Sequence, residues 1–383
     1  MVPDSLKCSI AEAGLNPGKV EELLARARRE VDAGLLSAAQ VALARNGRLA
    51  MLATFGDASQ ESLFCVFSAT KAVTSAAAWI LIEEGRLHEG EVVADIIPEF
   101  ASNGKDVIRV GQLLTHTAGL PAAPFRPLDW NDPARRRERY AQWKLNWTPG
   151  SRFEYHPSSS MWVIAELIER RAGQSFQSFI RERIAEPLGL EDLHVGLPDS
   201  AQGRAVLCEH GGQAMSDRDW RDLGLPPPPA TEVTEDAILS FNRPEVRAVG
   251  VPGGGAFMSA AELALFYQGL LHGGLRGQQV WSDAMLSDAR RVRTGKMADL
   301  WGMAANRGLG IIVAGDEKRS FRGFGKTNSP EAFGHNGAGG QLAWADPATG
   351  LSLGYCTSTH DRHAIRQGRR GVAISSIAAL CAS

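Results

Sequence analysis

The sequence predicts a mixed α/β (α+β) fold: one antiparallel sheet, flanked by helices and built from both chain ends, with an all-helical domain inserted between them. Three observations predict it. Hairpin patterns lie near the start and near the end of the chain, each beside a helical pattern, and the middle is largely helical. A chain of 383 residues is also long for one hydrophobic core, so we expect two lobes.

The amino-terminal part of the predicted sheet begins with a helix. Residues 17–33 alternate charged side chains with Leu and Val at helical spacing, which is typical of an amphipathic helix. Residues 39–44 and 49–55 are then joined through Asn46-Gly47, a dipeptide that type I′ hairpin turns favour. This end therefore predicts a helix followed by a β-hairpin.

The carboxyl-terminal part repeats the arrangement in reverse order. Residues 341–345 and 351–356 flank a Pro-Ala-Thr-Gly turn, and a helical pattern covers residues 362–379. We interpret the two hairpins as parts of one sheet.

This interpretation sets the expected domain organisation. We expect a discontinuous sheet domain of residues 1–75 and 245–383 and a mostly helical inserted domain of residues 76–244. The active site is expected between the two.

Composition limits the classes of function. Hydrophobic residues make up 44% of the chain and charged residues 22%, which is ordinary for a soluble globular enzyme. The formal net charge of −2 provides no basic field to attract nucleic acid. We therefore expect a small-molecule substrate, and the oligomeric state is left open.

Cysteine usage and the amino terminus bear on the compartment. Five scattered cysteines argue against a disulfide framework, fit a reducing compartment and show no zinc-ligand spacing. Residues 1–5 lack the features of an export signal, and no apolar run is long enough to span a membrane. We expect a cytoplasmic protein without membrane span, metal or cofactor.

Ser68-Ala69-Thr70-Lys71 places a hydroxyl and an amine three residues apart, where an apolar run turns helical. Residues i and i+3 share a helix face, so Lys71 can lie beside the Ser68 hydroxyl. A desolvated lysine can take the proton of a serine and make it a nucleophile. The pattern favours acyl transfer through a serine ester. The alternative is that Ser68 caps the helix and Lys71 is solvated.

The same spacing occurs a second time, as Ser102-Asn103-Gly104-Lys105. This copy lies in a turn-like cluster, where we expect no helix to align the two side chains. We therefore predict that it is not catalytic.

Three further segments contribute candidate side chains. Tyr155 stands at a loop-to-helix junction, and residues 333–340 form a glycine-dense stretch whose amides can donate to an oxyanion. Residues 119–150 carry Trp130 and Trp147 among prolines. These indoles belong either to a packed loop or to an aromatic pocket wall, and the sequence leaves both open.

In this order the motifs resemble the serine β-lactamase and penicillin-binding-protein superfamily, in the branch of class C β-lactamases, D-stereospecific peptidases and family VIII carboxylesterases. The resemblance covers most of the chain and includes residues 113–120, residues 253–262 and the final hairpin and helix. It implies a mixed α/β domain built from both chain ends with a helical insertion, which agrees with the two-hairpin interpretation.

The resemblance also implies roles for individual residues. Ser68 is the expected acylated nucleophile, Lys71 its base and Tyr155 the proton shuttle, and which of the last two carries the proton stays open. The family's Lys-Thr-Gly or His-x-Gly position is filled here by His335, Asn336 and Gly337. The backbone amides of Ser68 and Ala338 are the expected oxyanion hole, and Asn336, Gly337 and Gly339 are the expected substrate-binding residues beside it. Trp130 and Trp147 are expected to bind substrate only on the pocket-wall interpretation of residues 119–150.

Two departures from the family pattern shift the expected substrate. Pro157 stands where the Tyr-x-Asn motif has its amide, with His156 or Ser158 as partial substitutes, and His335 replaces a fixed positive charge. We therefore expect a serine carboxylesterase. A β-lactamase, a D-amino-acid peptidase, an acyltransferase and a silent homologue that only binds are the alternatives.

Overall fold

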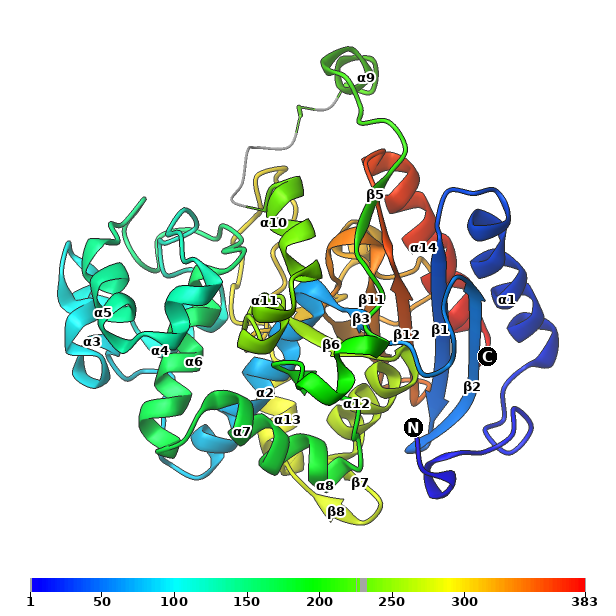
Figure 1. Ribbon diagram of the computed structural model, residues 1–383, viewed down its shortest axis with the longest axis horizontal. Coiled ribbons are helices and arrows are strands. Elements are labelled where there is room, and N and C mark those ends of the chain that lie inside the picture. Colours follow the sequence, from blue (N-terminus) through cyan, green and yellow to red (C-terminus); the bar gives the residue numbers. More distant parts are fainter. Residues whose placement is uncertain (1, 225, 228–232, 383) are drawn as a thin grey trace.

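The computed structural model describes residues 2–224, 226–227 and 233–382. Its centre is an antiparallel sheet in the order β2-β1-β12-β11-β10-β9 (Figure 1). These strands are β1 (Ala38–Arg45), β2 (Arg48–Gly56), β9 (Ile312–Val313), β10 (Phe333–Gly334), β11 (Leu342–Asp346) and β12 (Leu351–Thr357). The predicted fold class, with one antiparallel sheet from both chain ends, is confirmed.

The register at the centre of the sheet joins the two chain ends directly. Strand β1 runs antiparallel to β12, with Val41 opposite Tyr355. The β1–β2 turn has left-handed φ angles of 54° at Asn46 and 74° at Gly47, as a type I′ turn requires. Each predicted hairpin therefore forms.

Helices cover both faces of the sheet. Helices α1 (Pro17–Asp32) and α14 (Ala364–Leu380) pack side by side on one face, and α12 (Ala260–His272) covers the other (Figure 1). A Cβ atom at Gly354 of β12 would lie 2.1 Å from the Ala260 carbonyl oxygen, so this glycine lets α12 lie directly on the strand.

The inserted segment is mostly helical, and its core is continuous with that of the sheet. Helix α2 (Thr70–Glu83) packs against α6 (Ser159–Ala172), and both Trp79 and Trp162 are buried in one apolar cluster that reaches Ala42 of β1. Helix α2 crosses the expected boundary after residue 75. The domain limits stay a prediction.

Shorter elements complete the described part of the chain. The helices are α3 (Val93–Ile96), α4 (Val110–Leu114), α5 (Pro133–Gln142), α7 (Phe176–Ile180), α8 (Glu186–Leu188), α9 (Asp217–Asp222), α10 (Glu235–Leu239), α11 (Pro244–Val249) and α13 (Asp283–Arg290). The strands are β3 (Phe64–Cys65), β4 (His194–Val195), β5 (Glu209–Gly211), β6 (Ala256–Met258), β7 (Gly274–Leu275), β8 (Gln278–Gln279) and β13 (Thr359–Asp361).

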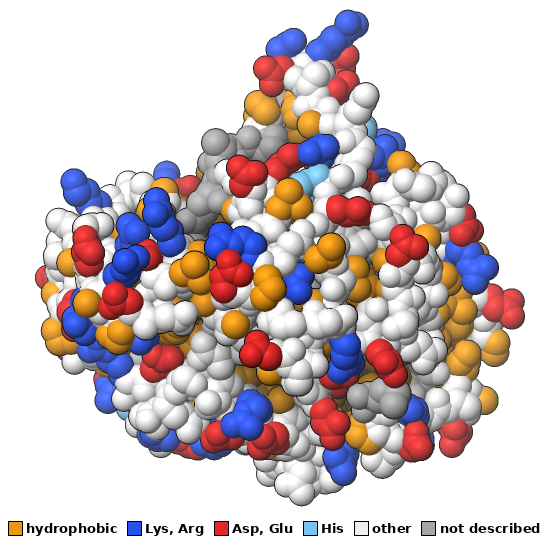
Figure 2. Space-filling model, viewed as in Figure 1, with side chains coloured by type: hydrophobic (Ala, Val, Ile, Leu, Met, Phe, Trp, Pro, Cys, Tyr) orange, Lys and Arg blue, Asp and Glu red, His pale blue; other side chains and the backbone are white. Residues whose placement is uncertain are grey.

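The surface agrees with the small net charge. Figure 2 shows acidic and basic side chains interspersed over the visible face, and Figure 1 shows α9 at the tip of a segment that extends from the body. Within the described ranges, no helix is long and apolar enough to cross a membrane.

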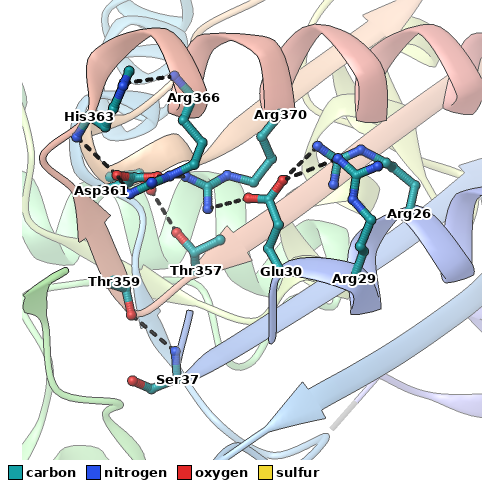
Figure 3. Close-up of polar contacts among 11 residues, drawn as sticks. Arg26, Arg29, Glu30, Ser37, Thr357, Thr359, Asp361, His363, Arg366 and Arg370 are labelled. Atoms are coloured by element: carbon teal, nitrogen blue, oxygen red, sulfur yellow. Dashed lines mark hydrogen bonds and ion pairs between the residues drawn. The ribbon is translucent and has the colours of Figure 1, made fainter. Parts of the chain in front are cut away.

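A buried ionic network ties both terminal helices to strand β13, which pairs with β5 outside the central sheet (Figure 3). Arg370 of α14 pairs with Glu30 of α1 (2.8 Å) and with Asp361 of β13 (3.1 Å). Just before β13, the Thr357 hydroxyl donates to the Gly339 carbonyl oxygen (2.8 Å). The glycine-dense segment is therefore attached to a rigid base.

Candidate active site

Ser68 lies in the short turn between β3 and α2. Phe67, directly before it, has a left-handed φ of 43°, which a bulky residue adopts only under strain. The Thr70 hydroxyl accepts a hydrogen bond from the Ala256 amide (2.9 Å), so β6 anchors the turn. Helix α2 is capped by Ala69 without a side-chain hydrogen bond. Ser68 is therefore presented at the surface of the turn and is not a helix cap.

Lys71 is fully buried beside Ser68. Its Nζ lies 3.3 Å from Ser68 Oγ, 2.6 Å from the Pro157 carbonyl oxygen and 2.7 Å from the Gly253 carbonyl oxygen. A neutral amine can donate its two hydrogens to these carbonyls and turn its lone pair to Ser68. An ammonium can donate its third hydrogen to Ser68 instead. The geometry therefore suits a group that takes and returns one proton.

Gly253 belongs to this site, and we did not predict this role from the sequence. A Cβ atom at this position would lie 3.3 Å from Lys71 Nζ and 3.4 Å from the Pro157 carbonyl oxygen. The run of three glycines at 253–255 was the available signal, because glycine permits close approach of a backbone to a functional group.

Tyr155 is half-buried in the loop before α6 and faces several candidate groups. Its ring centroid lies 5.2 Å from Lys71 Nζ and 6.0 Å from the His335 ring centroid. Two further neighbours were not predicted: the His116 ring at 4.8 Å and the Arg307 guanidinium at 5.4 Å. The structure therefore brings Ser68, Lys71, Tyr155 and His335 together.

His335 is buried and uncharged. Its Nδ1 lies 2.9 Å from the Asn336 carbonyl oxygen and donates to it, which leaves Nε2 without a proton and without a partner among the described residues. Burial, followed by the charges of Arg307 and Lys71, holds the pKa of His335 well below its usual range. His335 therefore supplies no positive charge at neutral pH.

His156 does not replace the missing amide. Its Nε2 accepts from the Leu120 amide (2.9 Å), and its Nδ1 donates to the Glu154 carbonyl oxygen (2.6 Å). Burial lowers the pKa of His156 to about 4. The ring is therefore a neutral clamp that ties the loop of residues 154–157 to residues 116–120. His116, whose Nδ1 accepts from the His156 amide (3.2 Å), belongs to the same clamp.

The glycine-dense segment passes directly beside the serine turn. A Cβ atom at Gly337 would lie 2.2 Å from the Val66 carbonyl oxygen, so any larger residue would push the two segments apart. Ala338 packs against the apolar cluster that contains Phe67. Gly339 has a left-handed φ of 79°. The amides of Ala338 and Ser68 therefore belong to adjoining segments, as an oxyanion hole needs.

Two further predicted substrate-binding residues, Asn336 and Trp147, lie in different places. Asn336 is half-buried, and its side chain lies against Gly323, where a Cβ atom would approach Asn336 Nδ2 to 1.4 Å. Trp147 packs on His156, with ring centroids 6.0 Å apart, and under the Arg152 guanidinium at 5.2 Å. It therefore belongs to the clamp around His156.

Trp130 lies in the core of the helical region and not in a pocket wall. It is 3% exposed and packs against three aromatic rings, those of Phe125, Trp162 and Phe176. The Arg136 guanidinium covers it at 4.3 Å from the ring. The indole therefore has no free face for a substrate. Of the two interpretations, a packed loop or a pocket wall, the packed loop is correct for Trp130.

The second Ser-x-x-Lys copy does bring its side chains together, contrary to our expectation. Lys105 Nζ donates to Ser102 Oγ (3.1 Å) and to the Trp143 carbonyl oxygen (2.6 Å). The Ser102 hydroxyl in turn donates to the Ala141 carbonyl oxygen (2.7 Å), and Asn103 bonds to both carbonyls. The cluster therefore satisfies the carbonyls at the end of α5.

The described residues form no metal centre. His, Cys, Asp and Glu side chains do not gather there in groups of three that could hold a metal ion. All five cysteines are free.

One family of known proteins matches most of the chain. A family model described as Beta-lactamase matches residues 23–375. The chain is 26% identical to the Esterase/beta-lactamase LipL of Mycobacterium tuberculosis (strain ATCC 25618 / H37Rv) over 316 residues, covering 77% of this chain and 69% of that protein.

Solved structures share the fold over almost the whole chain. A penicillin-binding protein homolog from Caulobacter crescentus is 28% identical with a TM-score of 0.75, covering 94% of this chain and 97% of that one. A family VIII carboxylesterase is 25% identical with a TM-score of 0.75, covering 94% and 98% respectively.

Proposed function

The chain belongs to the β-lactamase family of serine hydrolases, and we propose that it cleaves carboxylic esters through an acyl-enzyme on Ser68. The observation that carries the proposal is the contact between Lys71 Nζ and Ser68 Oγ (3.3 Å) inside a cage of two carbonyl oxygens. That cage leaves one position on the nitrogen for the serine proton.

The proposed reaction has two stages. Lys71 takes the proton of Ser68 while Oγ attacks the ester carbonyl carbon, and the amides of Ser68 and Ala338 donate to the oxyanion. The C–O bond to the alcohol then breaks, and Tyr155 protonates the departing oxygen and recovers a proton from Lys71. Water attacks the acyl-enzyme in the same way. One ester and one water become an acid and an alcohol, and the residues return to their starting forms.

Two features favour esters over lactams and amides. Pro157 gives Lys71 a backbone carbonyl at 2.6 Å but has no side-chain amide for a substrate. His335 is neutral because burial lowers its pKa. An ester has a better leaving group than an amide and needs less recognition. The printed names of LipL, an esterase/beta-lactamase, and of the family VIII carboxylesterase support the same choice.

A substrate screen tests the proposal. We expect wild-type protein to hydrolyse p-nitrophenyl acetate and butyrate, Ser68→Ala to lose this activity, and the matched control Ser102→Ala to keep it. Ester turnover that survives Ser68→Ala would overturn the proposal. Efficient nitrocefin hydrolysis with slow ester turnover would assign the site to β-lactams. Product formation that depends on an added alcohol would assign it to acyl transfer.

A further inference from the structure

Two of the five cysteines lie side by side in the folded chain, although they are scattered in the sequence. Cys65 of β3 is 2% exposed and Cys208, directly before β5, is 7% exposed, and both belong to one apolar cluster. Burial raises the pKa of the Cys65 thiol well above its usual range, and a hydrogen bond with the Cys208 thiol raises it further. The two sulfur atoms are therefore hydrogen-bonded neighbours.

The backbone keeps the two cysteines together. Leu63, shortly before Cys65, forms a parallel bridge with Ala205, which lies shortly before Cys208. The side chain of Asn242 then holds the backbone of Cys208 on both sides: Oδ1 accepts from the Cys208 amide and Nδ2 donates to the Cys208 carbonyl oxygen, at 2.7 Å each. The two segments therefore run side by side, so the two thiols meet in the resting fold.

A buried guanidinium lies beside the two thiols. Arg247 of α11 donates from Nε to the Phe241 carbonyl oxygen (2.7 Å), and its Nη2 has no hydrogen-bond partner within the described ranges. Burial lowers the pKa of Arg247, and the neighbouring groups that raise this pKa are the Cys208 and Cys65 thiols. A positive charge stabilises a thiolate, which is the form of cysteine that reacts with oxidants. The cluster therefore differs from an ordinary pair of buried cysteines.

The pair is connected to the candidate active site through the run of three glycines. The Cys65 thiol donates to the Gly254 carbonyl oxygen (3.4 Å), and Lys71 Nζ donates to the carbonyl oxygen of the preceding residue, Gly253 (2.7 Å). A sulfur atom in a disulfide has no hydrogen to donate. Oxidation of Cys65 would therefore remove a contact that holds the glycine segment in place beside Lys71.

We propose that Cys65 and Cys208 are a redox site: a peroxide oxidises them to an intramolecular disulfide, and the disulfide slows the reaction at Ser68. The second part rests on the proposed function. Cys208 is the more exposed thiol and directly follows Leu207, which is 62% exposed, so the peroxide reacts with Cys208 first. That step gives a sulfenic acid and one water, and the Cys65 sulfur then attacks the sulfenic sulfur, forms the S–S bond and releases a second water. Two thiols and one hydrogen peroxide thus become one disulfide and two waters, and the two electrons that the sulfur atoms lose are taken up by the peroxide.

Treatment of the purified full chain with hydrogen peroxide tests the inference. Digestion without reductant, followed by mass spectrometry, should find the peptides of Cys65 and Cys208 joined. We expect kcat/KM for p-nitrophenyl butyrate to fall by about tenfold, because a misplacement of about 1 Å at a reacting group costs up to about 100-fold. Dithiothreitol should restore the activity, which separates a disulfide from a sulfinic acid or a methionine sulfoxide.

The test variant is Cys208→Ala, and the matched control is Cys356→Ala. Both cysteines are buried, but Cys356 of β12 belongs to a different apolar cluster. The measured quantity for each protein is its activity after treatment divided by its activity before. We expect Cys208→Ala to keep its activity in peroxide and Cys356→Ala to lose as much as wild type does. Thermal unfolding checks that each variant folds, and if Cys208→Ala does not, Cys65→Ala decides the test.

The outcomes separate the redox site from the proposed function. Treated wild-type protein without the Cys65–Cys208 link overturns the redox site, and so does a link that leaves the activity unchanged. Equal losses in Cys208→Ala and wild type would assign the inactivation to another residue, such as the half-buried Cys8, and would also overturn it. Untreated wild-type protein that hydrolyses no p-nitrophenyl ester overturns the proposed function instead, and the link is still detected by its mass.

Discussion

The chain contains the same serine–lysine spacing twice, and the two copies have similar contacts but different surroundings. Lys71 Nζ lies 3.3 Å from Ser68 Oγ, and Lys105 Nζ lies 3.1 Å from Ser102 Oγ. Both lysines are fully buried. A short hydroxyl–amine distance therefore does not separate a nucleophile from a structural pair.

The two hydroxyl groups differ in where their protons go. Ser102 donates its proton to the Ala141 carbonyl oxygen at 2.7 Å, so it is committed to the end of α5. Ser68 has Lys71 beside it and stands in the strained turn after Phe67. Burial lowers the pKa of Lys105 to about 8, yet its Nζ lies over the Phe100 ring at 5.5 Å and its serine partner is bound to a helix-end carbonyl. A lowered lysine pKa is thus not enough to indicate a catalytic base.

The largest expected difference follows from removing each lysine. Lys71→Met should lower kcat/KM for p-nitrophenyl butyrate by about a thousandfold or more, because the serine loses its base. Lys105→Met should leave kcat/KM within about twofold and lower the free energy of unfolding by about 1–3 kcal/mol, because buried carbonyls lose a partner.

Steady-state kinetics and urea unfolding measure these effects, and a fluorophosphonate probe located by mass spectrometry gives a second readout. We expect the label on Ser68. A label on Ser102, or equal activity losses in the two lysine variants, would remove the distinction between the copies.

A smaller effect should follow from separating the glycine-dense segment from the serine turn. Gly337→Ala would place a Cβ atom 2.2 Å from the Val66 carbonyl oxygen and displace the Ala338 amide. We expect kcat to fall by about 100-fold, the usual cost of one oxyanion donor. The control is Gly90→Ala, where a Cβ atom meets nothing within 4 Å. Wild-type kcat in a folded Gly337→Ala would contradict the proposed oxyanion hole.

Much of this arrangement could be predicted because it depends on local patterns. The Asn46-Gly47 turn and the apolar run after Lys71 report their own conformations, and the two hairpins indicated the sheet. The segments that meet at Ser68 were also identified, because glycines and a tyrosine before a helix are visible in the sequence.

The failures concern contacts that no local pattern encodes. The Gly253 carbonyl reaches Lys71 from 182 positions away. Arg307 lies in a stretch without a pattern, and only the folded chain reveals that its guanidinium lies 5.4 Å from the Tyr155 ring centroid. For Trp130 the sequence left a packed loop and a pocket wall both open, and only the folded chain shows that neighbouring rings enclose it.

The smallest expected effect is a loss of stability at low pH. It should involve the carbonyl oxygens around Lys71 and not those around Lys105. His156 holds the loop that brings the Pro157 carbonyl to Lys71, and it accepts the Leu120 amide only while neutral. Burial lowers the pKa of His156 to about 4, below the unfolded value of about 6.5. Between these values the unfolded chain binds more protons, so stability falls as the pH falls.

This difference in pKa corresponds to a loss of about 2 kcal/mol of unfolding free energy between pH 7.5 and pH 5. Urea unfolding at both pH values measures it. His156→Gln should be less stable at pH 7.5 and should lose less on acidification than wild type does, whereas the control His88→Gln, at an exposed position, should follow wild type. The groups around Lys105 are the Ser102 hydroxyl and carbonyl oxygens at the end of α5, and none of these groups titrates between pH 5 and pH 7.5. An unchanged pH dependence in His156→Gln would therefore show that the neutral clamp does not hold the Lys71 cage in place.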